Sequence, residues 1–146
     1  MKPADLKQFP LFQDLLDDEL DLLCSLLEEQ QLTPGRRILR QGEEAESLVL
    51  VAEGAVSFET EEGDEATLEA PLSFGASSLV ASGPRLATVT TSTPSRVATL
   101  SRTAFHRFAD DAPRGAVRVL ESLVTDMAGL LRQSLDHTVD RIEGEN

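Results

Sequence analysis

Regularly spaced glycines are the feature that most constrains the fold of this chain. Between residues 32 and 100 the apolar segments are short. A glycine interrupts them every seven to twelve residues, at positions 35, 42, 54, 63, 75 and 83. Short strands separated by turn residues at this spacing are typical of a sandwich or barrel. We therefore expect about eight strands here, in a mainly β fold with flanking helices.

A helical period of apolar residues precedes the strand segment. Four leucines recur at spacings of four, three and four residues, which places them on one helix face: Leu16, Leu20, Leu23 and Leu27. Asp17 is the expected N-cap of this helix. Cys24 is the single cysteine of the chain and lies among these leucines. We expect a buried thiol there rather than a nucleophile, and no internal disulfide is possible.

A second helical period follows the strand segment. Ser101 is the expected cap of a short helix, and Pro113 suits the first turn of a long one. The long helix carries a heptad-like seam (Val117, Leu120, Val124, Met127 and Leu131) beside a second apolar stripe (Ala116, Val119, Leu123 and Leu130). One stripe can cover the β-structure while the other meets a partner, and residues 114–135 are the candidate homodimer helix. The polar tail from Asp136 is expected to fray.

Length and charge narrow the function classes. The 146 residues fit a single domain, residues 1–146. We divide it into an N-terminal helical part (1–31), a β-structure (32–100) and C-terminal helices (101–138). The formal net charge is -13, which argues against nucleic acid and against anionic membrane surfaces as partners. No segment looks like a signal peptide or a membrane span, so we expect a cytoplasmic protein.

The sequence offers no candidate catalytic residue, metal site or cofactor site. Both histidines, His106 and His137, follow the strand segment, and neither has cysteine or carboxylate neighbours at metal-ligand spacing. A metal enzyme on a β-roll would need histidines and a carboxylate on adjacent strands. The acidic residues 61–65 lack the ordered ligand alternation of a calcium loop, so a solvated hairpin is expected there. We therefore do not expect an enzyme.

Two segments together resemble the cyclic-nucleotide-binding domain family. Residues 35–58, GRRILRQGEEAESLVLVAEGAVSF, look like its pattern of a glycine turn, Gln-Gly-Glu, an apolar strand and a further glycine. Residues Phe74–Val89, FGASSLVASGPRLATV, look like its phosphate-binding cassette. The PLF at 10–12 and the flanking helices also fit, so the resemblance covers roughly residues 6–135. It implies a jelly-roll-like β-roll (a double-stranded β-helix) with an N-terminal helix and a C-terminal capping helix.

The resemblance also implies a site for a cyclic nucleotide, cAMP or cGMP, in this cassette. Arg85 would clamp the phosphate, because a guanidinium group offers a fixed fork of donors to phosphate oxygens. Backbone amides of small or neighbouring residues would complete the site: Gly75, Ala76, Ser77 and Ser78 before the arginine, and Leu86 and Ala87 after it. The signal would pass from this site to an effector protein of unknown identity.

Position 76 departs from the family pattern. The family usually has Gly-Glu where this chain has Gly75-Ala76, and that glutamate accepts a hydrogen bond from the ribose 2′-hydroxyl. A hydrogen bond to a charged group contributes about 1.5–3 kcal/mol, so its loss weakens binding by roughly 10- to 100-fold. Leu86 also replaces a serine or threonine found in several members. Two functions stay open: a stand-alone cyclic-nucleotide sensor, and a degenerate member that serves as a protein-interaction scaffold.

Overall fold

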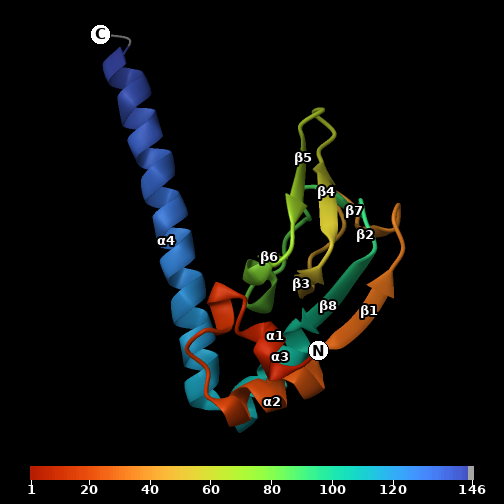
Figure 1. Ribbon diagram of the computed structural model, residues 1–146. Coiled ribbons are helices and arrows are strands. Elements are labelled where there is room, and N and C mark those ends of the chain that lie inside the picture. Colours follow the sequence, from red (N-terminus) through yellow and green to blue (C-terminus); the bar gives the residue numbers. More distant parts are fainter. Residues whose placement is uncertain (145–146) are drawn as a thin grey trace.

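Eight strands form two antiparallel sheets, as the glycine spacing predicts (Figure 1). The computed structural model describes residues 1–144. One sheet has the order β1 (Glu28–Leu32), β8 (Ser95–Ser101), β3 (Ser47–Glu53) and β6 (Leu72–Phe74). The other has the order β2 (Arg37–Leu39), β7 (Thr88–Thr91), β4 (Ala55–Glu59) and β5 (Glu65–Glu69). This arrangement confirms the expected β-roll.

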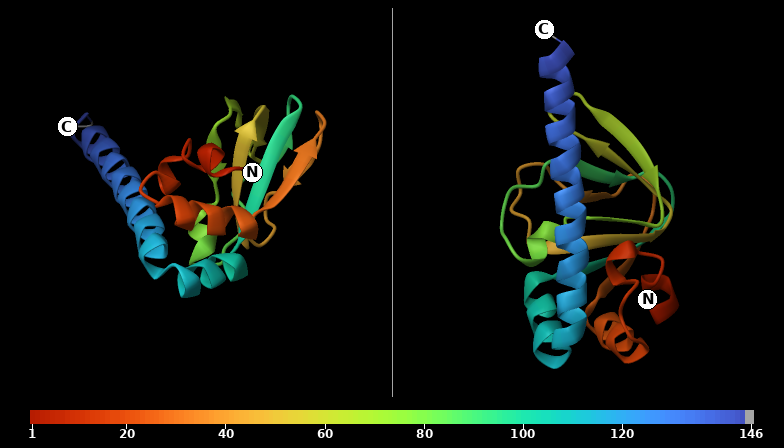
Figure 2. Two further views of the ribbon diagram at one scale, coloured as in Figure 1. Left: turned by 60° about the horizontal axis from the view of Figure 1, so that its bottom comes forward. Right: turned by 90° about the vertical axis from the view of Figure 1, so that its left-hand side faces the viewer.

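Most helical segments gather at one end of the roll, and the last helix starts there and runs past the strands, as Figures 1 and 2 show. Before β1 lie α1 (Pro3–Leu6), η1 (Pro10–Phe12) and α2 (Asp17–Leu26). After β8 lie α3 (Arg102–Asp111) and α4 (Pro113–Gly144). The predicted cap of α3 is confirmed, because the Ser101 hydroxyl accepts a hydrogen bond of 3.0 Å from the Ala104 N–H. Pro113 begins α4, as its position predicted.

Strand β3 is buried on both faces and joins two hydrophobic cores. Leu48 and Leu50 belong to the core that the helices cover, whereas Val49 and Val51 belong to the core between the two sheets. Successive side chains of a strand point to opposite faces, so a strand buried on both sides is apolar throughout. The run of aliphatic residues in β3 therefore reflects its central position.

The end of the N-terminal helical part differs from the prediction in two respects. The helical part was expected to reach residue 31, but β1 begins at Glu28 because the chain pairs there with Thr99 of β8. Asp17 is the first helical residue of α2, so its prediction as N-cap is wrong. The carboxylate of Glu19 instead accepts a hydrogen bond of 2.8 Å from the Leu16 N–H, which satisfies a free donor at the helix start.

Helix α4 runs beside the roll and leaves the body after its first turns (Figures 1 and 2). Ala116, Val119 and Leu123 are buried in the helical core, while Leu130 of the same predicted stripe is exposed. Their packing partners are α3 and η1 rather than the sheets. The helix continues to Gly144, so the expected fraying from Asp136 is wrong for the described residues; positions 145–146 lie outside them.

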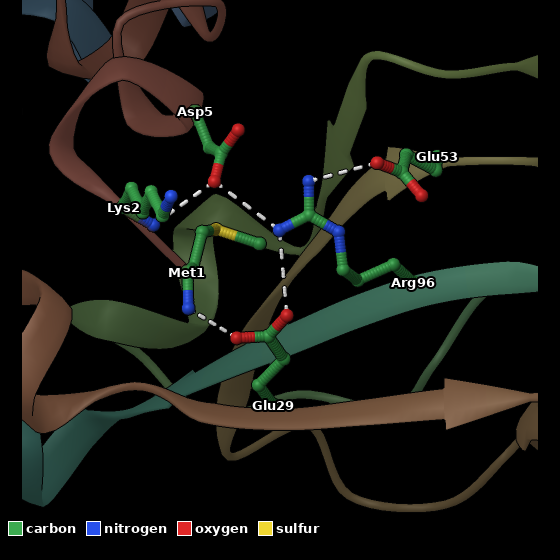
Figure 3. Close-up of polar contacts among 6 residues, drawn as sticks. All are labelled: Met1, Lys2, Asp5, Glu29, Glu53 and Arg96. Atoms are coloured by element: carbon green, nitrogen blue, oxygen red, sulfur yellow. Dashed lines mark hydrogen bonds and ion pairs between the residues drawn. The ribbon is translucent and has the colours of Figure 1, made fainter.

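An ion cluster centred on Arg96 fastens the N-terminal segment to the roll (Figure 3). Arg96 of β8 contacts Asp5 of α1 at 3.2 Å, Glu29 of β1 at 3.4 Å and Glu53 of β3 at 3.1 Å. Its hydrogen bond lowers the pKa of Asp5. The pKa of Glu29 is lowered first by the hydrogen bond from the Met1 α-amino group and then by Arg96. Both carboxylates therefore stabilise the fold in their charged form.

Replacing Arg96 is expected to lower the stability of the fold and to reduce the loss of stability that acid pH causes. Depressed carboxylate pKa values contribute stability that is present above the ordinary values of 3.8 and 4.5 and is lost as pH falls below them. Arg96→Met should lower the free energy of unfolding at neutral pH by about 1–2 kcal/mol. The difference from wild type should shrink between about pH 5 and pH 3 in urea titrations.

A suitable control is Lys7→Met, which removes the exposed Lys7–Asp17 pair. Exposed pairs contribute little, so this variant should behave like wild type at every pH. An Arg96→Met difference that stays constant from neutral to acid pH would contradict the assignment of this stability to the charged carboxylates.

Candidate ligand-binding site

A pocket of about 390 Å³ lies against the segment 74–89. The segment turns after β6 through the short helix η2 (Ala76–Leu79) and returns to the sheet at β7. Much of the wall is apolar, and Phe58 and Phe74 meet edge to face with their ring centroids 5.2 Å apart. Concave sites with apolar walls and a few polar groups are the common form of small-molecule sites. The remaining apolar lining comes from Leu39, Ala45, Ala81, Pro84, Leu86, Ala87 and Val89.

Six of the seven residues expected at the site line this pocket: Gly75, Ser77, Ser78, Arg85, Leu86 and Ala87. The seventh, Ala76, packs instead against the helical core. Leu86 is 82 % exposed, so its side chain lies at the pocket rim. The structure therefore brings the two halves of the predicted cassette together around one cavity.

Arg85 is held at both its backbone and its side chain. Its N–H donates to the Glu43 carbonyl at 2.7 Å, and its carbonyl accepts from the Gly42 N–H at 2.9 Å. The side-chain Nη2 donates to the Ser47 carbonyl at 2.8 Å and to the Ser47 hydroxyl at 3.2 Å. These contacts fix the direction in which the guanidinium group faces.

The charge of Arg85 is largely buried, with 8 % of the residue exposed. Burial lowers the pKa of Arg85, and the negative charge of Glu43 opposes this shift. An arginine side chain nevertheless keeps its proton at neutral pH. A protonated guanidinium thus lines the pocket, and among the described residues its Nη1 makes no hydrogen bond.

Gly75 allows the guanidinium group to lie against the backbone. Its φ of +78° is in the left-handed region, and a Cβ added here would lie 2.4 Å from Nη1 of Arg85 and 3.2 Å from the Ser47 carbonyl. A side chain at this position would therefore displace the arginine. The glycine that begins the cassette is required by both its conformation and the space it leaves.

Ser78 contributes a buried hydroxyl group to the pocket. Its N–H donates to the Gly75 carbonyl at 3.0 Å, which uses the amide within the turn. Ser78 is 1 % exposed, and its Oγ has no hydrogen-bond partner among the described residues. Unpartnered buried polar atoms are rare in native folds, and one beside a pocket calls for an explanation.

Arg102 connects the pocket wall to α3. Its Nε donates to the Ser78 carbonyl at 2.8 Å, and its Nη2 donates to the Ala45 carbonyl at 3.2 Å. Arg102 is the first residue of α3, and α3 packs against α4. Neither this role of Arg102 nor that of Ser47 has a local sequence signal, because both act through contacts with residues distant in the chain.

Carboxylate side chains and helix α4 do not contribute to the pocket wall within residues 1–144. Within residues 1–144 no aspartate or glutamate lines it, so Arg85 is its one charged lining residue. No residue of α4 as far as Gly144 lines it either. The helix expected to cap the ligand therefore does not contribute to the pocket wall in this structure.

The described residues contain no cluster of metal-ligating side chains, and none of the described helices combines the length and apolarity needed to cross a bilayer. Cys24 is half-buried, and burial raises the pKa of its thiol. Residues 61–65 form a turn in which the Thr60 N–H donates to the Asp64 carbonyl at 3.0 Å.

The sequence profile of the family described as "Cyclic nucleotide-binding domain" matches residues 29–112, more than half of the chain. The chain therefore belongs to the cyclic nucleotide-binding domain family. A cAMP-dependent protein kinase regulatory subunit from Yarrowia lipolytica is 36 % identical to it over 104 residues, or 70 % of this chain. The matched region spans 28 % of that regulatory subunit and 27 % of the one from Colletotrichum orbiculare, which is 31 % identical.

Solved structures show the same fold over nearly the whole chain. The Thermus thermophilus catabolite activator protein superposes with a TM-score of 0.75 and 29 % identity, covering 92 % of this chain and 63 % of that one. The N-terminal domain of a transcriptional regulator from Streptomyces coelicolor A3(2) gives a TM-score of 0.76 and 27 % identity, covering 92 % and 94 %. The match to these structures supports the β-roll and the helices on either side of it.

The close approach of Gly75 to Arg85 can be tested by stability. In Gly75→Ala the alanine must adopt a left-handed backbone conformation, and its Cβ must displace the guanidinium group of Arg85. Gly63→Ala is the matched control, because its φ is +96° and nothing lies within 4 Å of the added Cβ. The control should lose about 1–2 kcal/mol of unfolding free energy. Gly75→Ala should lose roughly 1.5–3 kcal/mol more in urea titrations. Equal losses would show that the arginine adapts freely.

Proposed function

We propose that this protein is a non-enzymatic regulatory module that binds a cyclic nucleotide, or a related phosphate ligand, through Phe74–Val89. The observation that carries the proposal is the buried, charged Arg85 at the pocket. Its Nη2 is engaged by Ser47, and its Nη1 makes no hydrogen bond to any residue from 1 to 144. A preorganised guanidinium donor in a low-dielectric site suits a phosphate oxygen. Family membership supports the same ligand class.

The remainder of the pocket suits an apolar body attached to that anion. Leu39, Phe58, Phe74 and Val89 line it, and no described carboxylate opposes the negative charge of the ligand. A purine base with a cyclic phosphate, as in cAMP or cGMP, has this division between a flat apolar part and an anionic part. The relatives named as cAMP-dependent protein kinase regulatory subunits are consistent with it.

The route from the pocket to an effector protein runs through α3 in this proposal. Arg102 holds the carbonyl of Ser78 in η2 and begins α3, which packs on α4. A ligand that draws η2 toward itself would therefore act on α3 and α4. Such coupling needs the ligand to bind one arrangement of the helices more tightly than the other. The effector protein would contact α4, and a cytoplasmic site of action follows from this role.

One observation favours the alternative of a degenerate scaffold. Ala76 supplies no acceptor for a ribose hydroxyl and packs against the helical core rather than the pocket. A member that had lost its ligand would keep the β-roll and use its surface for protein contacts. The two functions differ in whether the pocket binds a nucleotide at all.

Calorimetric titration with cAMP and with cGMP tests the proposed ligand. Saturable binding is expected to at least one of them. Arg85→Ala should weaken it by at least about tenfold, because hydrogen bonds to a charged group are lost. Arg107→Ala is a control with the same change of charge at an exposed helical position. No heat from either nucleotide at millimolar concentration would support the degenerate scaffold.

We further propose that α4 forms a homodimer through residues 114–135. Four of the five residues of the predicted seam face solvent in the single chain, with Val117 51 %, Val124 63 %, Met127 51 % and Leu131 62 % exposed. The fifth, Leu120, is half-buried against the helical core. Large contiguous apolar faces are typical of interaction sites. The spacing of three and four residues suits pairing with an identical helix.

A charge placed in the seam should separate the subunits. Val124→Glu is expected to shift the protein from dimer to monomer in sedimentation equilibrium, because it would bury a carboxylate between apolar faces. Gln133→Glu adds the same charge on the opposite side of the helix and should leave the dimer intact. A wild-type protein that is monomeric throughout the measured concentration range would contradict the proposed dimer.

A further inference from the structure

A second cavity, of about 250 Å³, lies between the edges of the two sheets. Strand β1 is the last strand of one sheet and β2 the last of the other, and residues of both line this cavity (Figure 1). Its apolar lining consists of Leu32, Ile38 and Val97, which belong to or pack against the core between the sheets. It shares no lining residue with the pocket beside the cassette, so it is a separate candidate site.

A buried threonine holds the turn that carries two arginines of this cavity. Thr91 is 3 % exposed, and its Oγ1 accepts from the Arg36 N–H at 2.9 Å and donates to the Thr33 carbonyl at 2.7 Å. Its N–H donates to the Arg36 carbonyl at 2.9 Å, and its carbonyl accepts from the Gly35 N–H at 2.8 Å. Four hydrogen bonds to one buried residue thus fix the backbone from which the Arg36 side chain extends, next to Arg37.

The charges of Arg36 and Arg37 are not used within residues 1–144. The ion pairs of arginine in this part of the chain involve Arg96, Arg114 and Arg118. Both Arg36 and Arg37 are exposed and line the cavity, in a chain with 26 acidic residues for 13 basic ones. Two neighbouring cations on a fixed turn suit a carboxylate from another molecule, because a guanidinium group offers it a fork of donors.

The other end of the cavity carries the opposite charge. Glu28, Gln30 and Leu32 alternate along β1 and line the cavity together, as residues on one face of a strand do. Glu28 is the first residue of β1 and makes no ion pair within residues 1–144, whereas Leu32 precedes the turn with the arginines. Four residues of strand span about 13 Å, so the two charged ends are separated by the length of a short peptide.

Strand β1 also has a free edge. It pairs with β8 on one side, and the sheet to which it belongs ends there within residues 1–144. An extended peptide can add to such an edge through main-chain hydrogen bonds and present alternate side chains to a neighbouring cavity. Charged residues at an edge disfavour segments that do not match them, so the charges of this cavity would select the added segment.

We propose that this cavity is a docking site for an extended segment of a partner protein, with a basic, an aliphatic and an acidic side chain at alternate positions. The acidic side chain would pair with Arg36 and Arg37, the aliphatic one would cover the apolar lining, and the basic one would pair with Glu28. Such a segment has no net charge, so the charge of -13 on the chain does not oppose its approach. The local ion pairs then decide which segment binds.

The experiment measures the binding of two end-blocked fluorescent peptides to the full chain by anisotropy. Lys-Thr-Val-Thr-Glu should bind saturably, and Lys-Thr-Val-Thr-Lys should bind at least about tenfold more weakly, because it places a cation beside the arginines. The double variant Arg36→Glu, Arg37→Glu should reverse this preference. Its turn should persist, because main-chain atoms of residues 35 and 36 make the hydrogen bonds to Thr91.

The double variant Arg132→Glu, Arg141→Glu is the matched control, with the same change of charge at exposed positions of α4. It should keep the preference of wild type for the glutamate peptide. A reversal in the control as well would show that binding follows the net charge of the protein, and would overturn the proposal. No saturable binding of the glutamate peptide at millimolar concentration would overturn it too, as would equal affinity of wild type for both peptides.

Discussion

The arrangement of the candidate site depends on how Arg85 is held. Burying a guanidinium group is unfavourable unless its donors are satisfied, and here Ser47 satisfies one of its two terminal nitrogens. The other faces the space that Gly75 leaves by having no side chain. If the second terminal nitrogen also donated to the protein, the guanidinium group would have no terminal donor left for a ligand. The half-satisfied arrangement instead leaves a fixed charge with an unused donor, which is the state that favours an anionic ligand.

The same interaction joins the pocket to the helices. Ser47 begins β3 and is paired with Ser101, which caps α3. Arg102, the next residue, holds the pocket wall through Ser78, so cassette, sheet and helix meet within a few residues. The position of β3 between the two cores makes this junction rigid, because its side chains are packed on both faces. A change at the pocket is therefore transmitted by contacts between well-packed elements rather than by a loop.

Features that depend on local sequence could be predicted, and features that depend on distant contacts could not. The turn glycines, the cap at Ser101, the helix start at Pro113 and the succession of strands along the chain follow from residue preferences within a few positions. The cassette could be located because its residues are contiguous. The burial of the Glu19 side chain could not be predicted, because it lies against α4, where Arg114 contacts it at 2.7 Å. The exposure of Leu130 likewise depends on the point at which α4 separates from the rest of the domain. The spacing of apolar residues along α4 does not determine that point.

The missing carboxylate has a physical consequence beyond the loss of a ribose contact. The chain carries a net charge of -13, so its overall field opposes the approach of any anion. A glutamate at position 76, in the proposed site, would add one more negative charge near the phosphate, and within a pocket of low dielectric this repulsion is weakly screened. Alanine removes that repulsion together with the hydrogen bond. In the proposed function, selectivity then rests on Arg85 as the donor to the anion and on the apolar walls. A pocket of this kind rejects ligands that lack the charged group far more strongly than ligands that lack a sugar hydroxyl.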